Sequence, residues 1–224
     1  EIDPGNLILS GNQNLEKLGV EVFQGSNNWA VSGKKSKSGK PLLANDMHLG
    51  LFAPGIWYQM HHQAEGAVNV TGLVLPGQPF VICGHNDSIA WGMTNVAVDD
   101  LDFYAETLNE DSTKYLFNSE WKDLKTQDEI IRTKEGEEIQ ERLKFTHRGP
   151  VVSRFKNKAE KAISIRWVGN EMSNEIRAVY LLNRAKNWAD FRNATATFSS
   201  VSQNIVYADM DGNIGLQCAA GIPI

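Results

Sequence analysis

Short segments with alternating apolar and polar positions dominate the chain from Asn28 onward. This period of two, interrupted by Gly, Asn and Asp, is typical of β-strands that expose one face and bury the other. The segments span residues 29–31, 41–44, 56–61, 68–74, 80–83 and 88–91. The first half of the chain is therefore predicted to form antiparallel β-structure.

Three further stretches have the turn residues of β-hairpins. They are residues 115–121, residues 130–132 with 138–146, and residues 204–209 with 213–218. The last pair flanks Asp211-Gly212, which is a common hairpin turn. These stretches extend the β-structure through the second half of the chain.

Two helices are expected after about residue 173. Ser173-Asn174-Glu175 can cap the first helix, because Asn and Ser side chains accept hydrogen bonds from free amides at a helix start. Asn187 begins the second, with Trp188 and Phe191 turned inward. In the first helix, four apolar residues are predicted to share one side: Ile176, Val179, Tyr180 and Leu182. Many strands with two late helices predict an α+β fold.

The bulk properties narrow the classes of function. The 224 residues are 42% hydrophobic, which suffices for one large domain or two small ones. The 22 basic and 27 acidic residues give a net charge of −5 without a basic stripe, so we expect no nucleic-acid partner. No apolar run reaches the ~20 residues of a membrane helix. Because the chain starts at Glu1 without an initiator Met, we expect an internal piece of a longer protein.

The cysteines and histidines do not form a metal-binding pattern. Cys83 and Cys218 are too few for a disulfide framework and are predicted to be buried free thiols. The spacing of His48, His61, His62 and His85 differs from that of zinc ligands, which argues against a zinc site. Asp209 to Asn213 superficially resembles an EF-hand opening, but its glycine comes too early and a hairpin turn is favoured.

Local chemistry leaves several candidate residues undecided. Gly25-Ser26-Asn27-Asn28 by itself favours a turn, since these residue types dominate turns. His48 by itself favours a strand-edge histidine bonded to backbone. The acidic stretch 99–102 by itself is compatible with a solvated polar loop. The wider context is needed to choose.

A series of motifs resembles the start of the large subunit of the penicillin acylase family. The resemblance spans about residues 24–220 and keeps the order and spacing of the motifs. Those motifs are residues 25–33, 40–49, 53–54, 57–58, 70–72, 75–77, 84–86, 89–95, 99–102, 183–188 and 207–215. It implies part of a four-layer αββα sandwich of antiparallel sheets, the fold of N-terminal-nucleophile (Ntn) hydrolases. Residues 1–25 would end a spacer, and residues 26–224 would begin the large subunit.

The resemblance also implies the chemistry. The family precursor cuts itself before its nucleophile, here at Gly25–Ser26. The freed α-amine of Ser26, with a reference pKa of about 7.7–8.0, would then act as its general base. The enzyme would hydrolyse the linear amide of an N-acyl substrate, such as a penicillin or an acyl-homoserine lactone, through an acyl-enzyme. This fragment alone is expected to be inactive, because a second oxyanion donor (an Asn side chain) and an Arg of the family lie beyond Ile224.

Two further residues take catalytic roles by the same resemblance. His48 would orient Ser26. The backbone N–H of Asn95 would form half of the oxyanion hole, where one donor is worth about 2.7–4 kcal/mol. An asparagine departs from the small or aliphatic residue expected at this position.

Asp99, Asp102 and the Leu101 carbonyl match the family's calcium segment. One structural Ca²⁺ per heterodimer would take its remaining ligands from outside this chain. The implied partner is the small subunit of the same precursor, and the implied location is the bacterial periplasm or the outside of the cell. The alternatives are an uncleaved, non-catalytic β-rich module of the same fold, and a β-sandwich receptor domain unrelated to hydrolases.

Overall fold

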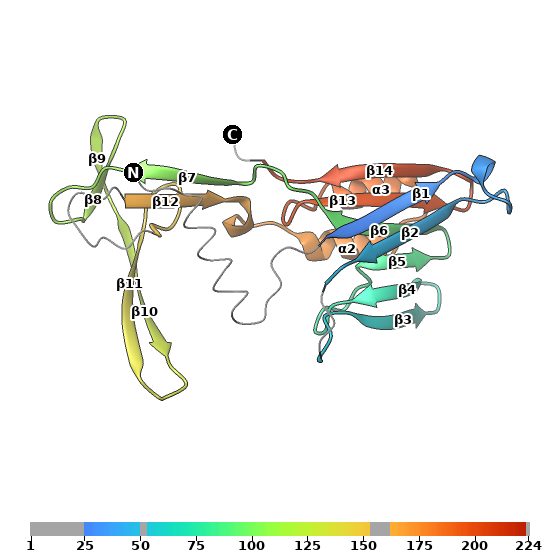
Figure 1. Ribbon diagram of the computed structural model, residues 1–224, viewed down its shortest axis with the longest axis horizontal. Helices are drawn as coiled ribbons and strands as arrows, with labels where there is room; N and C mark the ends of the chain where they lie inside the picture. The colour runs from blue at the N-terminus through green and yellow to red at the C-terminus, as the bar shows by residue number, and fades with distance from the viewer. Residues whose placement is uncertain (1–24, 50–52, 153–161, 223–224) are drawn as a thin grey trace. The chain divides into compact units, whose positions relative to one another are not determined.

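The computed structural model describes residues 25–49, 53–152 and 162–222 (Figure 1). These residues form two compact units. The sheet unit contains residues 25–49, 53–98 and 171–222, and the ribbon unit contains residues 99–152 and 162–170. Apart from Gly25, the predicted spacer over residues 1–25 lies outside the described residues, so its boundary stays a prediction.

A six-stranded antiparallel sheet forms the middle of the sheet unit, in the order β14-β13-β6-β5-β4-β3. Its strands are β3 (Tyr58–Ala64), β4 (Val68–Val74), β5 (Cys83–Asn86), β6 (Ile89–Asn95), β13 (Gln203–Asp209) and β14 (Ile214–Ala219). The predicted strands and the last predicted hairpin are confirmed. The strand predicted over residues 80–83 is the exception: β5 begins at Cys83, so most of the predicted apolar segment precedes the strand.

A pair of strands, called the ribbon below, covers one face of this sheet. It belongs to the sheet unit and is distinct from the ribbon unit. It pairs β1 (Ser26–Val31) with β2 (Leu42–Met47), and the turn between them holds the short 3-10 helix η1 (Gly33–Lys35). The Asn28 side-chain amide donates to the carbonyls of Gly92 and Asn204 at 3.3 and 3.0 Å. These bonds attach the ribbon to β6 and β13.

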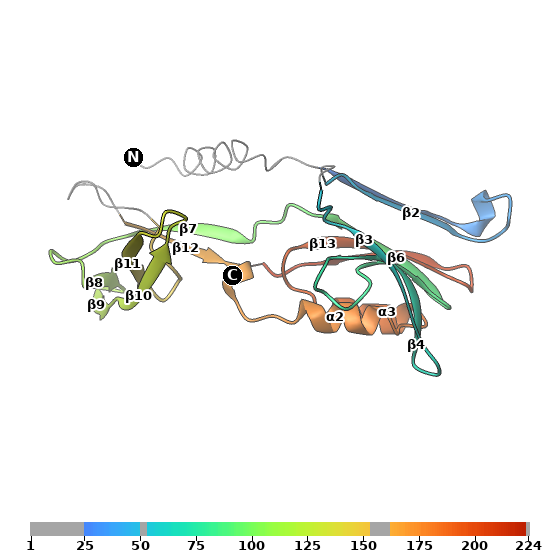
Figure 2. The same ribbon diagram turned by 90° about the horizontal axis from the view of Figure 1, so that it is seen from below.

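Two helices cover the opposite face of the sheet, as Figure 2 shows. They are α2 (Glu175–Leu182) and α3 (Trp188–Thr195). The Asn174 side chain caps α2 by accepting from the amide of Arg177, and the Asn187 side chain caps α3 in the same way from Asp190. Both predicted helices are therefore confirmed, and their amides at these positions are satisfied by the capping side chains.

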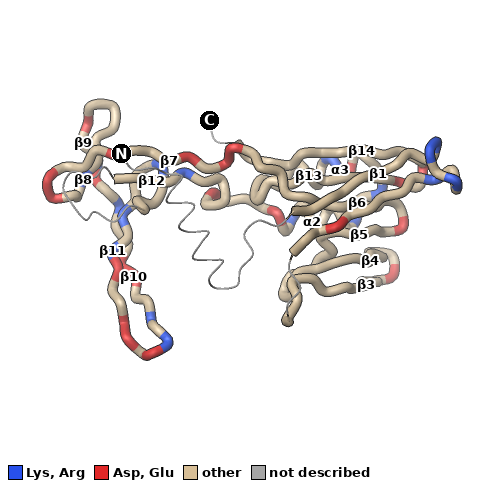
Figure 3. Tube along the Cα trace, in the orientation of Figure 1, with Lys and Arg blue, Asp and Glu red and all other residues tan. Residues whose placement is uncertain are grey.

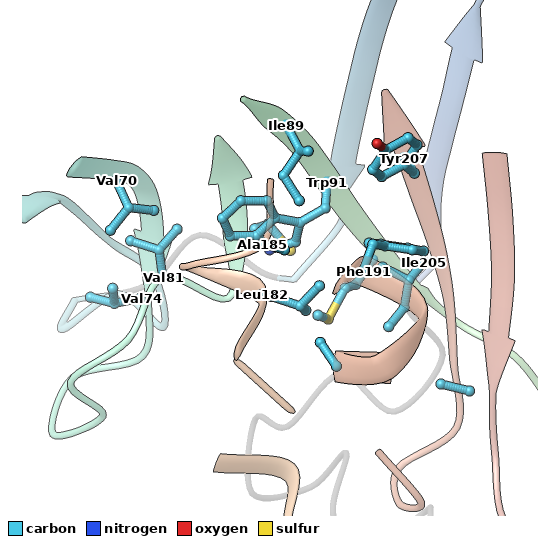
Figure 4. Close-up of a cluster of buried hydrophobic side chains, with 14 residues drawn as sticks. Val70, Val74, Val81, Ile89, Trp91, Leu182, Ala185, Phe191, Ile205 and Tyr207 are labelled. Atoms are coloured by element: carbon cyan, nitrogen blue, oxygen red, sulfur yellow. The ribbon is translucent and has the colours of Figure 1, made fainter. Parts of the chain in front are cut away.

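The core lies between the helices and the sheet (Figure 4). Trp91, Leu182, Phe191, Ile205 and Tyr207 are all at most 1% exposed. The side chains of Phe191 and Tyr207 pack with ring centroids 4.9 Å apart. Helices, sheet and ribbon make three successive layers of an α+β fold, as expected.

The predicted apolar side of α2 was partly wrong. The buried residues are Ala178, Val179 and Leu182, whereas Ile176 and Tyr180 are 59% and 40% exposed. Ala178 is fully buried, and its small side chain allows α2 to pack closely against its neighbours. Tyr180 lies at the flank of the helix, where it packs edge-on against Phe80.

The ribbon unit is built from three strand pairs and the short 3-10 helix η2 (Val168–Asn170). The hairpins β8 (Lys114–Phe117) with β9 (Glu120–Asp123), and β10 (Lys125–Arg132) with β11 (Glu138–Phe145), confirm two predictions. The pair β7 (Leu101–Glu106) with β12 (Ala162–Trp167) was not predicted. Its strands are far apart in sequence, so no local turn signal announces their pairing.

The two cysteines differ in their exposure to solvent. Cys83 is buried, and this burial raises the pKa of its thiol to about 12, although a backbone hydrogen bond from Met93 opposes the shift. Cys218 is exposed, so the prediction of a buried thiol was wrong there. It lies on β14, an edge strand of the sheet, and faces away from the core.

Among the described residues, no helix has the length and apolar character to cross a membrane.

Candidate active site

Ser26 lies at the wall of a cavity of about 360 Å³ in the sheet unit. This volume is within the range of pockets that bind small molecules. Polar lining residues besides Ser26 include Thr94, Asn95 and Glu175. Most of the remaining wall is apolar: Met47, Leu49, Trp57, Leu75, Ile82, Met93, Ile176, Val179, Phe198 and Val201. The cavity therefore places one hydroxyl beside a space suited to an apolar group.

The ribbon positions Ser26 and the peptide bond before it. Ser26 is the first residue of β1 and pairs with Met47 of β2. One residue earlier, the Gly25 carbonyl accepts a hydrogen bond of 2.9 Å from the main-chain N–H of His48. The carbonyl of the bond predicted to be cut is thus already held by a donor.

The imidazole of His48 lies beside Gly25, since a Cβ on that glycine would be 3.6 Å from His48 Cδ2. The Asn27 side-chain amide lies 3.1 Å from Nε2, and Asp46 lies 3.2 Å from Nδ1. The imidazole is therefore oriented by neighbours of Ser26 in the ribbon. The described hydrogen bonds do not join this ring to Ser26 itself, so its orienting role stays a prediction.

Asn95 is the last residue of β6 and faces the same cavity as Ser26. The N–H of Val96 donates to Ser202 on the β13 side, whereas the N–H of Met93 donates to the Asn45 side chain. Backbone N–H groups alternate in direction along a strand, so the N–H of Asn95 points to the same side as that of Met93. The Asn95 side-chain oxygen accepts from the Gln203 side-chain amide at 2.5 Å, and the predicted role of the Asn95 N–H stays a prediction.

Glu175 is a cavity residue that the sequence did not identify. One carboxylate oxygen accepts from the amides of Ser199 and Ser200 at 3.0 and 2.9 Å, and the other accepts from the Ser173 hydroxyl at 2.7 Å. Burial tends to raise the pKa of Glu175, but these hydrogen bonds outweigh it and the pKa is lowered. The spacing of Ser173 and Glu175 at a helix start was the available signal, and it was interpreted only as a cap.

The predicted calcium residues lie in the ribbon unit. Asp99 precedes β7, while Leu101 and Asp102 are its first residues. The Asp102 carboxylate accepts from the Tyr104 hydroxyl at 3.3 Å. Two carboxylates and a carbonyl have the hard oxygen chemistry that Ca²⁺ prefers, but fill only part of its six to eight positions. The described residues contain no group of three or more His, Cys, Asp or Glu that could hold a metal, and the calcium site stays a prediction.

Comparisons with known proteins agree on one family. The penicillin amidase family model matches residues 6–224. The acyl-homoserine lactone acylase QuiP of Pseudomonas aeruginosa is 31% identical over 93% of this chain and 26% of its own length. Penicillin G acylase of Escherichia coli is 28% identical over 95% of this chain and 26% of its own length. The chain thus spans about a quarter of these relatives.

A solved structure has the same fold. The thermostable penicillin G acylase from Alcaligenes faecalis superimposes with a TM-score of 0.76 and 27% identity, over 86% of this chain and 35% of that one. This match confirms the predicted Ntn-hydrolase fold, with its antiparallel sheets and few helices.

Proposed function

The chain belongs to the penicillin amidase family, and we propose that it is the part of an amidohydrolase that carries the nucleophile, Ser26. The relatives that resemble it are named as acylases of penicillin G and of acyl-homoserine lactones. The observation that carries the proposal is that Ser26 and Asn95 line one cavity with an apolar wall. A nucleophile and an oxyanion donor must both reach one carbonyl carbon, and a shared cavity permits this.

Processing precedes the reaction: hydrolysis of the Gly25–Ser26 bond consumes one water, leaves a carboxylate on Gly25 and frees the α-amine of Ser26. The Ser26 hydroxyl then attacks the substrate amide carbonyl, and its proton passes to this amine. The N–H of Asn95 donates to the oxyanion. The amine product leaves with the proton, and an ester remains on Ser26. Water attacks the ester and gives a proton to the same base, which passes it to the Ser26 oxygen as the acyl–oxygen bond breaks and the acid is released.

The cavity wall supports an apolar acyl group on the substrate, since burial of apolar surface contributes about 25 cal/mol per Å². The class is an N-acyl amide such as a penicillin or an acyl-homoserine lactone. We also propose a small subunit from the same precursor as partner, and the periplasm or the outside of the cell as location. Asp99, Asp102 and the Leu101 carbonyl would hold a structural Ca²⁺, which stabilises the fold without entering the reaction.

The test uses the complete precursor. Mass spectrometry of the purified wild-type protein should give a chain that begins at Ser26, and this protein should release acid and amine from N-acyl substrates. Ser26→Ala should abolish both cleavage and hydrolysis. Ser38→Ala is the matched control, because Ser38 lies in the turn of the same ribbon and bonds Ser36 and Lys40 there.

Two results would contradict the proposal. Cleavage before residue 26 that persists in Ser26→Ala would exclude Ser26 as the nucleophile of processing. A wild-type chain that stays intact and inactive would favour the alternative, a non-catalytic β-rich module of the same fold.

A further inference from the structure

Asn45 joins the strand that carries Ser26 to the strand that ends at Asn95. Its side-chain amide nitrogen donates to the Asn27 carbonyl at 3.1 Å and to the Met93 carbonyl at 2.9 Å. Its side-chain oxygen accepts from the Met93 N–H at 2.9 Å. One half-buried side chain therefore contacts the residue after the nucleophile and the residue two positions before the oxyanion donor.

The two bonds to Met93 replace a missing strand partner. β5 pairs with β6 at Ala90 and Trp91, and this described pairing stops before Met93. Beyond that point one edge of β6 opens toward the cavity that Met93 and Asn95 line. The Asn45 amide bonds both backbone groups of Met93, as a neighbouring strand would. It thus fixes the open end of β6.

The approach of Asn45 to β6 is close enough to need a glycine. A Cβ on Gly92 would lie 2.6 Å from the Cβ of Asn45, which is too short for a contact between two carbon atoms. A side chain at position 92 would therefore displace Asn45. The Gly92 carbonyl in turn accepts from Asn28. Asn28 of β1 and Asn45 of β2 thus contact the same short segment of β6, Gly92 and Met93.

We propose that Asn45 is a positioning residue for the reaction: it holds the main chain that presents the Asn95 N–H at a fixed place relative to Ser26. This inference rests on the proposed function. Asn45 is not among the residues that line the cavity, so it acts through Met93 and Asn27 and leaves substrate contacts unchanged. Its loss should therefore lower kcat, while KM should change little.

Asn45→Asp is the sharpest variant. The carboxylate has nearly the same shape and can still accept from the Met93 N–H, but it cannot donate to the carbonyls of Met93 and Asn27. Those two carbonyls would then face a negative charge. Asn45→Ala removes all three bonds without adding charge. Asn187→Asp is the matched control, since the Asn187 side-chain oxygen caps α3 by accepting from the Asp190 amide, a role that a carboxylate keeps.

The experiment measures kcat and KM of the complete enzyme. Mass spectrometry determines the fraction of chains that begin at Ser26, and kcat is expressed per such chain. We expect kcat to fall about tenfold to a hundredfold in Asn45→Asp and Asn45→Ala, below the roughly 10²–10³-fold loss for removal of a whole oxyanion donor. KM should stay within about twofold, as uniform binding is untouched. A boronic acid that mimics the tetrahedral intermediate should bind more weakly in proportion to the fall in kcat.

An unchanged kcat in either cleaved, folded variant would overturn the inference, as would an effect confined to KM. Failure of both variants to fold would assign Asn45 to folding and would also overturn it. An inactive wild-type enzyme, or an active Ser26→Ala variant, would instead refute the proposed function. A wild-type enzyme that depends on Ser26 but not on Asn45 would refute this inference alone.

Discussion

The two units bury different kinds of side chain. In the sheet unit, helices and sheet enclose apolar residues such as Trp91, Phe191 and Ile205. In the ribbon unit, a buried carboxylate occupies the interior: Glu106 is 3% exposed, accepts twice from Arg148 at 3.1 and 3.2 Å, and accepts from the Ser164 hydroxyl at 2.6 Å. The first interior depends mainly on close packing of a large apolar cluster, whereas the second combines fewer buried apolar residues with these satisfied polar contacts.

Aromatic rings complete the polar interior of the ribbon unit. The Arg148 guanidinium lies over the rings of Tyr104 and Phe117, at 4.4 and 5.4 Å from their centroids. His147 packs against Phe117 with the ring centroids 4.1 Å apart. Burial, followed by the neighbouring charge of Arg148, lowers the pKa of His147. The interior of the ribbon unit thus combines a few buried apolar residues, such as Leu124, Ile163 and Val168, with a cation held by a carboxylate and by ring faces.

The β10–β11 hairpin of the ribbon unit is more exposed to solvent than any strand of the layered sheet unit. Every residue of β10 is exposed, and Figure 3 shows charges of both signs along the pair. The Arg142 guanidinium pairs with Asp128 across the strands, and this hydrogen bond lowers the pKa of Asp128. Ser26, His48, Asn95 and Glu175 all belong to the layered sheet unit. The groups proposed to react need precise placement, and layered packing supplies the rigid support for it.

The largest expected effect is the loss of a core ring. Phe191→Ala should destabilise the sheet unit by about 3–5 kcal/mol, because it leaves a cavity between α3 and the sheet. The control, Ile131→Ala on β10, should cost about 0.5 kcal/mol or less, since Ile131 is 53% exposed. Hydrogen exchange of amides in β13 and β10 measures each unit separately. Equal losses would show that the hairpin is covered in the whole protein.

The next effect concerns the polar interior. Arg148→Met should destabilise the ribbon unit by about 3 kcal/mol, because Glu106 would remain buried without its cation. Arg142→Met on the exposed β10–β11 pair is the matched control and should change stability little. Hydrogen exchange in β7 and β12 reports the change. A small loss in Arg148→Met would mean that Glu106 is held by Ser164 and solvent.

The smallest effect is pH-dependent and concerns the cavity wall. A lowered folded-state pKa means that the Glu175 carboxylate stabilises the fold fully above its unfolded pKa of about 4.3. That contribution is lost as the pH falls through the lower folded pKa. Glu175→Gln should cost about 1 kcal/mol at pH 7, and the difference from wild type should shrink near pH 3. Exchange of the Ser199 and Ser200 amides measures it, and a pH-independent difference would contradict the prediction.

Local signals were sufficient for much of the fold. The capping residues Asn174 and Asn187 predicted the starts of both helices, and the turn Asp211-Gly212 predicted the β13–β14 hairpin. The β7–β12 pair was missed because its strands lie far apart in the chain. The buried side of α2 was partly missed because the sheet selects which side faces inward. Glu175 was missed as a cavity residue because its partners, Ser199 and Ser200, follow in another loop.

The sequence by itself determined most strand and helix types and the family motifs, on which the prediction of Ser26 as nucleophile rests, since these depend on residue identity and local order. Only the tertiary structure decided which residues share the Ser26 cavity, and that Asn45 links β2 to the open end of β6. The physical reason is that hydrogen bonds between distant strands depend on register and layer packing. A period of two reveals neither of them.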